Sequence, residues 1–403
     1  MLSLEDAQAQ ILQAIRPAIA TETVALEQAA GRFLAQEVAA RVDHPGFDNS
    51  AMDGYAVRSA DLRAQAFVLP VIGASSGGDP PKALAPGTAM RIFTGAPLPE
   101  GADTVVIQED VQVSAGNAQF PRSVAADQNI RRRAEDFRGG ETLYAAGRRL
   151  NAFDLALLAT AGVDHVSVYV RPRALVVATG NELVPPGQAL APGQVYESNR
   201  LATCVQLREL GADVIDGGTV RDDPKALRAR LADAGDYDFV ITSGGASVGD
   251  HDLIKQVFGE LGTIRLWKVR VKPGKPIAFG YLGARSHFFA LPGNPVSSLV
   301  TYKLFVEPAL IAWHHGTPVR AELRAQAANG FRRRPGRTEF LRARLFTEAG
   351  QLQAEALPGQ GSHMVGTLRA TNGLIRIEAD SSGFSAGDDL WVVPLRSDAF
   401  GRV

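Results

Sequence analysis

Cysteine is nearly absent from this chain, which contains Cys204 alone among 403 residues. One cysteine excludes an intrachain disulfide framework and any zinc or iron–sulfur site built from several cysteines. Long apolar runs are also missing, because no uninterrupted stretch approaches the roughly 18 residues of a membrane-spanning helix. Glu5 and Asp6 stand where a secretion signal would carry cations. We therefore expect a cytoplasmic protein that is neither secreted nor membrane-spanning.

An excess of charge of one sign is missing as well. The chain carries 42 lysines and arginines against 43 acidic residues, and this balance lacks the electrostatic signature of a protein that binds nucleic acid or an anionic membrane. We expect neither as a partner. Lysine itself is scarce, with 7 against 35 arginines, yet three of the seven fall within eight residues, at Lys268, Lys272 and Lys275. That cluster predicts a local site for an anion.

The length of the chain and the change of residue pattern along it both predict several domains. At roughly 150 residues per domain, the chain is long enough for about two to four. Helical periodicity is found over residues 3–16, is expected again from about Leu26 to Ala39, and returns near Phe153, whereas short β-rich runs broken by proline and glycine lie between. We expect a discontinuous helical domain (1–43 and 147–171), an inserted antiparallel β domain (44–146), an α/β domain (172–319) and a C-terminal β barrel or sandwich (320–403).

The α/β domain is predicted from regular alternation of strands and helices over roughly 145 residues. Apolar runs at 174–180, 212–220 and 238–245 are typical of buried strands, and a helical segment follows each of them. Such alternation predicts a parallel, doubly wound sheet. In these sheets ligands bind at the carboxyl ends of the strands, near the point where the strand order reverses.

Each loop that follows one of these three strands contributes a carboxylate to this edge. Glu182, Asp222 and Asp252 could together bind Mg²⁺, which prefers a few carboxylates plus substrate phosphate oxygens. Taken singly, the two aspartates have alternative roles, because Asp222 or Asp223 could cap the following helix and Asp252 could begin the next one. Three carboxylates at one edge favour the metal site.

A glycine-rich loop follows the third strand. Its three glycines would let the backbone approach a ligand closely and point N–H groups at phosphate or oxyanion oxygens. The spacing of Gly245, Ser247 and Gly249 also matches the nucleophile elbow of esterases, but too many residues separate the strand end from Ser247 for that geometry. We expect ligand binding by Ser243, Gly244, Gly245, Ser247 and Gly249.

The lysine cluster lies on a predicted strand and on the turn that follows it. Lys268 and Lys272 are four residues apart, so on one extended strand their side chains would share a face. Gly274 then turns the chain and brings Lys275 round, in a loop that two prolines stiffen. The loop lacks the Ser or Thr of a Walker A motif, and no G-x-G-x-x-G fingerprint occurs in the chain. The alternative, a solvated lysine face, fits poorly in a chain that otherwise uses arginine.

Several longer motifs occur together and in order along the chain. They are PGFDNSAMDGYAV from Pro45, RIFTGA from Arg91, NIRRRAED from Asn129, the Thr179-Gly180 loop, SGG from Ser243, KPGKP from Lys272 and LPGNP from Leu291. In this combination the chain resembles the molybdopterin molybdenumtransferases, the bacterial MoeA proteins that are related to the gephyrin E domain.

The resemblance implies a fold and a reaction. The fold would be the four domains above, with a molybdopterin-binding α/β domain. The reaction would be insertion of molybdenum from molybdate into adenylylated molybdopterin, with Mg²⁺-dependent cleavage of the pyrophosphate bond and release of AMP. Family members are homodimers whose active site lies between the α/β domain of one subunit and the inserted domain of the other. Transient contacts with the molybdopterin adenylyltransferase and with cofactor-accepting enzymes are implied as well.

The resemblance also implies roles for individual residues. Mg²⁺ and the pyrophosphate would be held by Glu182, Asp222 and Asp252. A second subunit would close the site with Asp53, Thr94, Arg131 and Asp136. Molybdate would be bound by Lys272, Lys275, Ser297, Arg337 and Ser362, and the lysine cluster adds Lys268 to the expected site residues. The molybdopterin would be bound by the glycine-rich loop together with Pro292, Gly293 and Asn294. Asn181 stands where relatives often carry Asp, so it is not assigned as a metal ligand.

Two other functions stay open from the sequence alone. The chain could adenylylate molybdopterin itself, because the α/β domain by itself would look like that neighbouring enzyme. It could also be a non-catalytic dimeric scaffold that binds a partner's peptide, as gephyrin does. The retained carboxylates and lysines favour the molybdenumtransferase.

Overall fold

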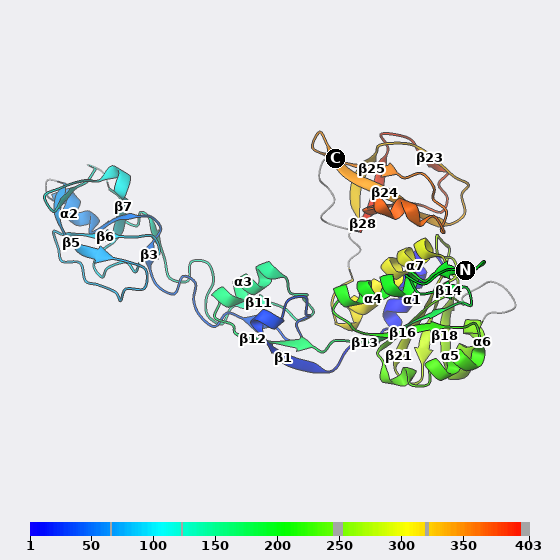
Figure 1. Cartoon of the computed structure of the whole chain (residues 1–403). Helices are drawn as coiled ribbons and strands as arrows, with labels where there is room; N and C mark the ends of the chain where they lie inside the picture. Colours follow the sequence, from blue (N-terminus) through cyan, green and yellow to red (C-terminus); the bar gives the residue numbers. More distant parts are fainter. Residues whose placement is uncertain (65–66, 122–123, 245–252, 319–321, 396–403) are drawn as a thin grey trace. The chain divides into compact units, whose positions relative to one another are not determined.

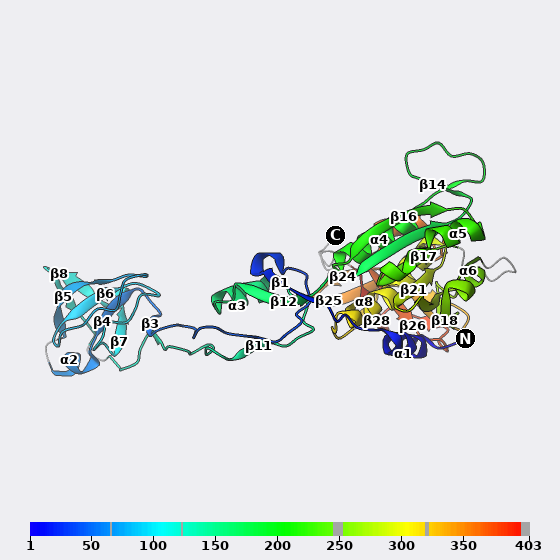
Figure 2. The same cartoon turned by 90° about the horizontal axis from the view of Figure 1, so that it is seen from below.

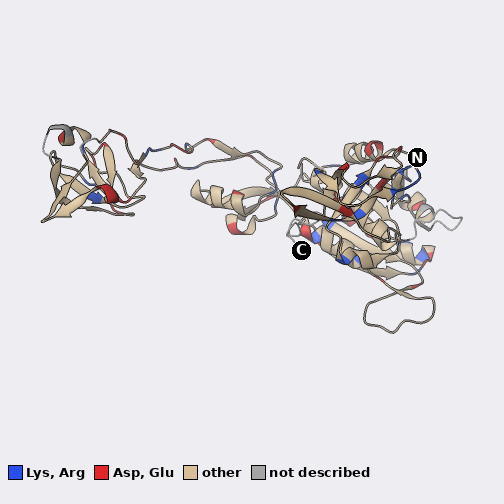
Figure 3. Cartoon of the chain, turned by 90° about the horizontal axis from the view of Figure 1, so that it is seen from above, with Lys and Arg blue, Asp and Glu red and all other residues tan. Residues whose placement is uncertain are grey.

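The computed structural model of the chain describes residues 1–64, 67–121, 124–244, 253–318 and 322–395 (Figure 1). The chain divides into two compact units. Unit 1 comprises Met1–Glu22, Gly31–Phe33 and Tyr169–Val403, and unit 2 comprises Thr23–Ala30 and Leu34–Val168. Acidic and basic residues alternate along the chain in both units (Figure 3), in keeping with the net charge of −1. The expected boundaries of four domains stay a prediction.

One region of unit 2 packs a helix against short strands. The helix, α3 (Ala152–Thr160), begins after Asn151, whose side chain forms a reciprocal capping box with Asp154. Leu158 of this helix is fully buried in the core of the region. The strands are β1 (Thr21–Ala25), β2 (Val38–Ala39), β11 (Thr142–Tyr144) and β12 (His165–Tyr169).

The helix expected from Leu26 to Ala39 is wrong. Only the 3₁₀ turn η1 (Leu26–Gln28) forms there. The N–H groups of Leu34 and Ala35 donate instead to the carbonyl groups of Arg148 and Ser167, which lie far away in the sequence. The apolar residues of this stretch still enter the core, but they do so from segments whose backbone is paired with distant parts of the chain.

The other region of unit 2 is a six-stranded sheet in the order β7-β4-β6-β5-β9-β8. Its pairings are antiparallel, as expected, apart from the parallel pair β5 and β6. Gly54 is needed where β4 approaches β7, because a Cβ there would lie 2.1 Å from the carbonyl oxygen of Val106. The elements are β3 (Asn49–Ser50), β4 (Gly54–Val57), α2 (Ser59–Ala64), β5 (Val68–Ser75), β6 (Ala89–Ile92), β7 (Thr104–Ile107), η2 (Gln108–Asp110), β8 (Gln112–Ser114), β9 (Asn117–Gln119) and β10 (Ile130–Arg131).

The α/β part of unit 1 is a six-stranded sheet in the order β16-β13-β17-β21-β20-β18. The first four strands are parallel, and β20 runs antiparallel to both of its neighbours. The chain runs from β13 to β16 on one side and then to β17 on the other, so the sheet is doubly wound, which confirms the expected fold class. The strands are β13 (Arg173–Thr179), β16 (Asp213–Val220), β17 (Phe239–Ser243), β18 (Gly262–Trp267), β20 (Ala278–Leu282) and β21 (Ser286–Leu291), with the small pair β14 (Leu183–Val184) and β15 (Val195–Tyr196).

Helices cover both faces of this sheet, with α4 and α6 on opposite sides of the strands (Figure 2). On the α6 side, Phe258 stacks on Phe288 of β21 at 3.5 Å between ring centroids. In the part of the chain that the structure describes, no helix is long and apolar enough to cross a membrane. The helices of unit 1 outside the barrel are α1 (Leu4–Ala14), α4 (Asn199–Glu209), α5 (Pro224–Arg230), η3 (Ala234–Asp236), α6 (Leu253–Leu261), α7 (Pro295–Thr301), the π-helical turn η4 (Tyr302–Val306) and α8 (Glu307–Trp313).

In the C-terminal part of unit 1, drawn in orange to red in Figure 1, five strands close into a barrel. The ring runs β24-β25-β22-β28-β26, and β26 pairs again with β24, so the expected barrel or sandwich is a barrel. A further strand, β19 (Val271–Lys272), comes from the α/β part and pairs with β24. The barrel elements are β22 (Leu323–Ala327), β23 (Phe331–Arg332), β24 (Thr338–Glu348), β25 (Gln351–Ala356), η5 (Val365–Arg369), β26 (Gly373–Ile377), β27 (Gly383–Phe384) and β28 (Asp389–Pro394).

Candidate active site

The strand order of the α/β sheet reverses between β13 and β17. Gly244, directly after β17, has φ +87°, and a Cβ on it would lie 2.3 Å from the carbonyl oxygen of Thr179 at the end of β13. Gly293 lies in the loop after β21, and a Cβ there would lie 3.5 Å from the Cα of Gly244. The loops after β13, β17 and β21 therefore meet at one edge of the sheet.

Two residues of the predicted glycine-rich loop, Ser243 and Gly244, are described. Beside Gly244 lies the buried hydroxyl of Thr179, which has no hydrogen-bond partner among the described residues. A buried hydroxyl without a partner costs free energy, so a polar group of the loop or of a ligand is needed there. Outside the described residues lie Gly245, Ser247 and Gly249.

Two of the three expected carboxylates act on each other at this edge. The pKa of Asp222 is raised because its carboxyl group is partly desolvated, although the residue as a whole is exposed, and because the charge of Glu182 repels a second negative charge. The N–H group of Asp222 donates to Asn181 Oδ1 at 3.2 Å, which ties the two loops together. Asp252 lies outside the described residues, so its contribution stays a prediction.

Asp223, and not Asp222, caps the helix α5. Its carboxylate accepts hydrogen bonds from the N–H groups of Lys225 and Ala226, both at 3.2 Å. Asp222 is therefore free of the capping role and shares the edge with Glu182. Over the described ranges no group of three or more His, Cys, Asp or Glu residues could hold a metal ion. A pair of carboxylates that repel each other fits Mg²⁺, which takes one or two carboxylates and completes its shell with phosphate oxygens and water.

The loop between β21 and α7 connects this edge to the barrel. Asn294 Nδ2 donates to Ser362 Oγ at 3.0 Å, and the N–H group of Val296 donates to the carbonyl oxygen of Ser362 at 3.2 Å. Gly293 and Asn294 are exposed at the edge, whereas Pro292 is buried. The structure thus brings Ser362 of the barrel onto the predicted binding loop of the α/β part.

The expectation that Lys268 and Lys272 share one strand face is wrong. β18 ends at Trp267, Lys268 has φ +70°, and the chain then leaves the α/β sheet to form β19 on the barrel. A left-handed residue breaks the alternation of side chains on which the expectation depended.

Lys272 and Arg337 both lie where β19 meets β24. The ammonium of Lys272 lies 2.8 Å from a carboxylate oxygen of Glu339, and the other oxygen of that carboxylate lies 3.1 Å from the guanidinium of Arg333. Arg337 Nη1 donates to the carbonyl oxygen of Val271 at 3.3 Å. One lysine of the cluster, Lys272, is therefore paired with the buried carboxylate of Glu339.

Sequence reasoning missed Glu339, although a signal for it exists. Alternation along the TEFLRARLF stretch of β24 puts Glu339 on the same face as Leu341, Ala343 and Leu345, which form the barrel core. A carboxylate on an inward face needs a cationic partner. That requirement predicts an ion pair with a nearby lysine or arginine.

Lys275 follows the turn at Gly274, which packs directly on α7. A Cβ on Gly274 would lie 2.3 Å from Thr301 Cγ2 and 3.8 Å from the carbonyl oxygen of Ser297. Lys275 is half-buried, and the side chain of Ser297 is buried. The loop from Lys272 to Lys275 therefore lies against the helix that follows the predicted binding loop.

In unit 2, Asp53 and Thr94 bond to each other. The N–H group and the hydroxyl of Thr94 both donate to Asp53 Oδ1, at 2.7 and 2.8 Å. These two bonds, the backbone one first, lower the pKa of Asp53, and the charge of Arg91 acts in the same direction. Arg131 and Asp136 are exposed, at β10 and shortly after it.

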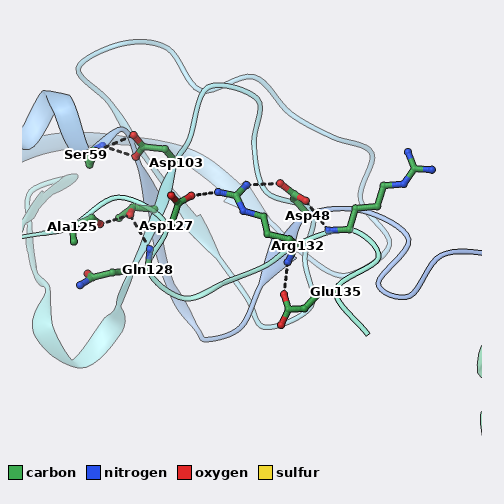
Figure 4. A network of polar contacts seen from close by, with 10 residues as sticks. Asp48, Ser59, Asp103, Ala125, Asp127, Gln128, Arg132 and Glu135 are labelled. Atoms are coloured by element: carbon green, nitrogen blue, oxygen red, sulfur yellow. Dashed lines mark hydrogen bonds and ion pairs between the residues drawn. The ribbon is translucent and has the colours of Figure 1, made fainter. Parts of the chain in front are cut away.

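Arg132, the middle arginine of the NIRRRAED motif, forms ion pairs and hydrogen bonds with other residues of unit 2 (Figure 4). Arg132 bonds through its guanidinium to Asp48 and Asp127, and its N–H group donates to Glu135 Oε2 at 2.7 Å. The N–H group of Arg133 donates to Asp48 as well, at 2.8 Å. These contacts make Arg132 a structural residue of the loop.

Family comparisons cover most of the chain in three pieces. Residues 2–162 match the MoeA N-terminal region (domain I and II). Residues 175–312 match a probable molybdopterin binding domain, and residues 324–395 match the MoeA C-terminal region (domain IV).

Similar proteins extend over nearly the full length. A protein of Haemophilus influenzae named molybdopterin molybdenumtransferase is 38% identical over 98% of this chain and 99% of its own. Molybdopterin molybdenumtransferase 2 of Mycobacterium tuberculosis is 36% identical over 96% of this chain and 97% of its own. The crystal structure of the molybdopterin biosynthesis MoeA protein from Pyrococcus horikosii matches with a TM-score of 0.79 and 31% identity, over 98% of this chain and 100% of that one.

Proposed function

The chain belongs to the MoeA family and is an enzyme of molybdenum cofactor biosynthesis of the molybdopterin molybdenumtransferase type, and we propose that it inserts molybdenum from molybdate into adenylylated molybdopterin. In this reaction water cleaves the pyrophosphate bond of the adenylylated substrate, so that AMP leaves and the molybdopterin keeps its own phosphate. The two dithiolene sulfurs bond to molybdenum, and one molybdate oxygen leaves as water with the two thiol protons. The substrates are therefore a pyrophosphate and an oxyanion, and both require positive charge and hydrogen-bond donors at one site.

The meeting of three loops where the strand order reverses supports this proposal most. The close approach of Gly244 to Thr179 leaves no room for a side chain, so half-buried backbone without a side chain stands at the edge where doubly wound sheets bind ligands. We assign the pyrophosphate and the molybdopterin to this edge, with Ser243 and Gly244 and the loop that follows them on one side, and Pro292, Gly293 and Asn294 on the other.

We assign Glu182 and Asp222 to the metal, together with Asp252. Mg²⁺ bound there would neutralise the oxygens of the pyrophosphate as its bond to AMP breaks. The two described carboxylates repel each other, which is expressed in the raised pKa of Asp222. A divalent cation and the substrate would remove this repulsion, so the pair is suited to bind them together.

We assign molybdate to the cationic loop and its surroundings, which include Lys272, Lys275, Ser297, Arg337 and Ser362. Lys272 is oriented by Glu339 at 2.8 Å, and Arg337 uses one N–H group for the carbonyl of Val271, which leaves further donors of its guanidinium for an oxyanion. Lys268 stays in the proposed set, without the shared strand face. These groups would hold the dianion near the dithiolene and offset its charge.

We further propose a homodimer in which a second subunit closes the site with Asp53, Thr94, Arg131 and Asp136. The double hydrogen bond from Thr94 fixes the Asp53 carboxylate in one orientation, as a group that meets a substrate across an interface requires. We also propose that the protein is cytoplasmic. It would make transient contacts with the molybdopterin adenylyltransferase and with cofactor-accepting enzymes.

The decisive measurement is AMP release from adenylylated molybdopterin by the purified full-length chain. We expect release to need both molybdate and Mg²⁺, and to be lost in Lys275→Ala. Lys82→Ala is the matched control, since Lys82 pairs with Asp79 and is not among the residues assigned to the site. Equal consumption of the adenylylate without molybdate would contradict the insertion role.

Mixing two inactive variants tests the shared site. Asp53→Ala and Lys275→Ala subunits, co-expressed with different tags and purified as heterodimers, should regain up to about half of the activity, since one of the two sites would then be intact. Heterodimers that stay inactive would contradict a site shared between subunits.

A further inference from the structure

A pocket of about 800 Å³ opens at the amino ends of the parallel strands of unit 1. Among its lining residues, Arg173 begins β13, Asp213 begins β16, and Arg285 directly precedes β21. The candidate active site lies at the other end of the same strands. The length of β13, about 20 Å at ~3.3 Å per residue, separates the two sites.

The lining of this pocket is cationic. Five arginines face three carboxylates, which leaves two positive charges in excess. Two of the arginines are neutralised, because Arg32 pairs with Glu22 and Arg285 pairs with Asp238 at 3.0 Å. The three that remain are Arg16, Arg171 and Arg173.

The guanidinium groups of these three arginines bond to carbonyl groups and, within the described part of the chain, to no carboxylate, although the backbone N–H group of Arg173 donates to Asp238 Oδ2 at 2.9 Å. Arg171 and Arg173 donate to the carbonyl oxygens of Gly211 and Asp236, at 3.2 and 3.0 Å, and Arg16 donates to a carbonyl oxygen as well. A guanidinium has five N–H donors. Arg16 and Arg173 also lie over the rings of Tyr281 and Tyr237, at 4.3 and 5.2 Å to the ring centroids. Each of the three keeps N–H donors for a ligand, and Asp213 is the acidic residue of the lining outside the two ion pairs.

Other residues that line the pocket carry no charge, among them His287, Trp313 and Ile19. His287 is 1% exposed and uses both ring nitrogens, since Nε2 accepts from the N–H group of Arg16 at 2.9 Å and Nδ1 donates to the carbonyl oxygen of Asp238 at 3.0 Å. The apolar lining includes Ile19, which is 95% exposed, and Trp313, which is 5% exposed. The pocket thus combines unpaired guanidinium groups with an apolar wall.

We propose that this pocket binds a small phosphate ester, with the phosphate against Arg16, Arg171 and Arg173 and the carbon part against Ile19 and Trp313. Guanidinium groups bind phosphate through paired, charge-assisted hydrogen bonds. The attraction comes from the arginines alone, because the helices that end at this edge direct the negative ends of their dipoles toward it. Such a site is separate from the pyrophosphate site of the proposed reaction.

Isothermal titration calorimetry of the full-length chain with phenyl phosphate tests the proposal, in EDTA and at low salt. We expect one phenyl phosphate per chain, weaker binding of inorganic phosphate and no binding of phenol. Arg171→Gln/Arg173→Gln should weaken phenyl phosphate binding at least about tenfold, since each lost charge-assisted bond contributes roughly that factor. Arg16→Gln, in a loop outside the sheet, should weaken it several-fold and serves if the double variant fails to fold.

Two control variants test whether the measured heat of phenyl phosphate binding comes from this pocket. Arg208→Gln removes an exposed arginine of α4 that does not line the pocket, and Lys275→Ala alters the candidate active site, so both should bind phenyl phosphate like the unchanged chain. Trp313 adds an optical signal: with Trp267→Phe and Trp391→Phe it is the remaining tryptophan of three, and its emission should change on binding. The proposal is overturned if the unchanged chain shows no 1:1 binding, if the arginine variants keep it, or if Lys275→Ala loses it.

Discussion

The ammonium of Lys272 lies 2.8 Å from the carboxylate of Glu339, a residue that is 3% exposed. The same carboxylate pairs with Arg333, whose side chain is only 5% exposed. One carboxylate thus holds an exposed cation at the proposed oxyanion site and a buried cation of the barrel. Because exposed ion pairs contribute little to stability and a buried charge without its partner costs several kcal/mol, the two cations have different roles.

Substitution separates these roles. We expect Glu339→Gln to lower the free energy of unfolding by about 3 kcal/mol, because it leaves the guanidinium of Arg333 buried without its counter-charge. Lys272→Met should lower it by less than about 1 kcal/mol and should still abolish AMP release. Urea unfolding and the AMP assay measure the two effects. If Glu339→Gln lost as little stability as Lys272→Met is expected to lose, Arg333 would not depend on the carboxylate.

Gly244 and Gly218 offer a matched pair for the edge where three loops meet. Both have positive φ, at +87° and +74°, but a Cβ on Gly218 meets no atom within 4 Å, whereas a Cβ on Gly244 would lie 2.3 Å from the Thr179 carbonyl oxygen. Alanine should cost roughly 1–2 kcal/mol of conformational free energy at either position. We expect Gly244→Ala alone to reduce AMP release as well, by about a hundredfold, because it displaces the loops. Full activity of Gly244→Ala would contradict the proposed site.

Much of the fold can be predicted from the sequence because its signals are local. The apolar runs that become β13 and β17 are bounded by turn residues and followed by helical spacing, so type and order of the elements follow from short windows. The edge that carries Glu182 and Asp222 follows from the same pattern, since parallel strands end on one side. Asp223, one of the two aspartates expected as candidate caps, does cap α5.

The rest depends on contacts between distant segments. Leu34 has helical spacing with its neighbours, yet its N–H group bonds to Arg148. Lys268 lies in a stretch with strand propensity, but the chain changes sheets there. The pairing of Lys272 with Glu339 joins the α/β part to the barrel, and no window of sequence includes both residues.

His287 predicts a loss of stability in mild acid. Burial lowers its pKa from 6.5 to about 4. Between these values the unfolded chain binds a proton that the folded chain does not, so the free energy of unfolding falls as the pH drops through this window, by about 3 kcal/mol at 1.36 kcal/mol per pKa unit. Urea unfolding from pH 7 to pH 4.5 should show this slope, and His287→Gln should reduce it. His363→Gln, an exposed control, should keep the slope; equal slopes in both variants would remove His287 as its cause.

Asp222 should make the folded chain less stable as the pH rises, which is the opposite of the pH dependence expected from His287. Since its folded pKa is raised above 3.8, its stabilising contribution exists below that value and is lost as the pH rises through the folded pKa. At pH 7 the ionised pair with Glu182 is unfavourable, so Asp222→Asn should leave the melting temperature unchanged or raise it.

With added MgCl₂, the unchanged chain should have a higher melting temperature than Asp222→Asn. A cation that binds the folded chain raises the melting temperature by mass action, and we expect this rise in the unchanged chain and its loss in Asp222→Asn. Asp223→Ala is the control: it removes the cap of α5 and about 1 kcal/mol of stability, but it should keep the response to Mg²⁺. A response that survives in Asp222→Asn would exclude Asp222 as a ligand.

Arg342 fixes the barrel loop that carries Ser362. The residue is 1% exposed, and its Nη2 donates to the carbonyl oxygens of Gly359 and Gly361 at 2.6 and 3.1 Å, while Nη1 donates to that of Met364 at 3.4 Å. Three carbonyl groups of one loop thus share one guanidinium. Because Ser362 contacts the loop at Asn294 from this position, Arg342 acts on the proposed oxyanion site through the backbone.

Arg342→Lys should therefore affect binding more than turnover. An ammonium is a compact charge that cannot reproduce the planar fork of donors, so we expect the KM for molybdate to rise about tenfold with a smaller change in kcat. Arg344→Lys is the matched control, because Arg344 lies two residues along the same strand and pairs with Glu355; its kinetics should not change. Steady-state AMP release at varied molybdate measures both. If kcat fell while the KM for molybdate stayed constant, Ser362 would not be positioned for oxyanion binding by Arg342.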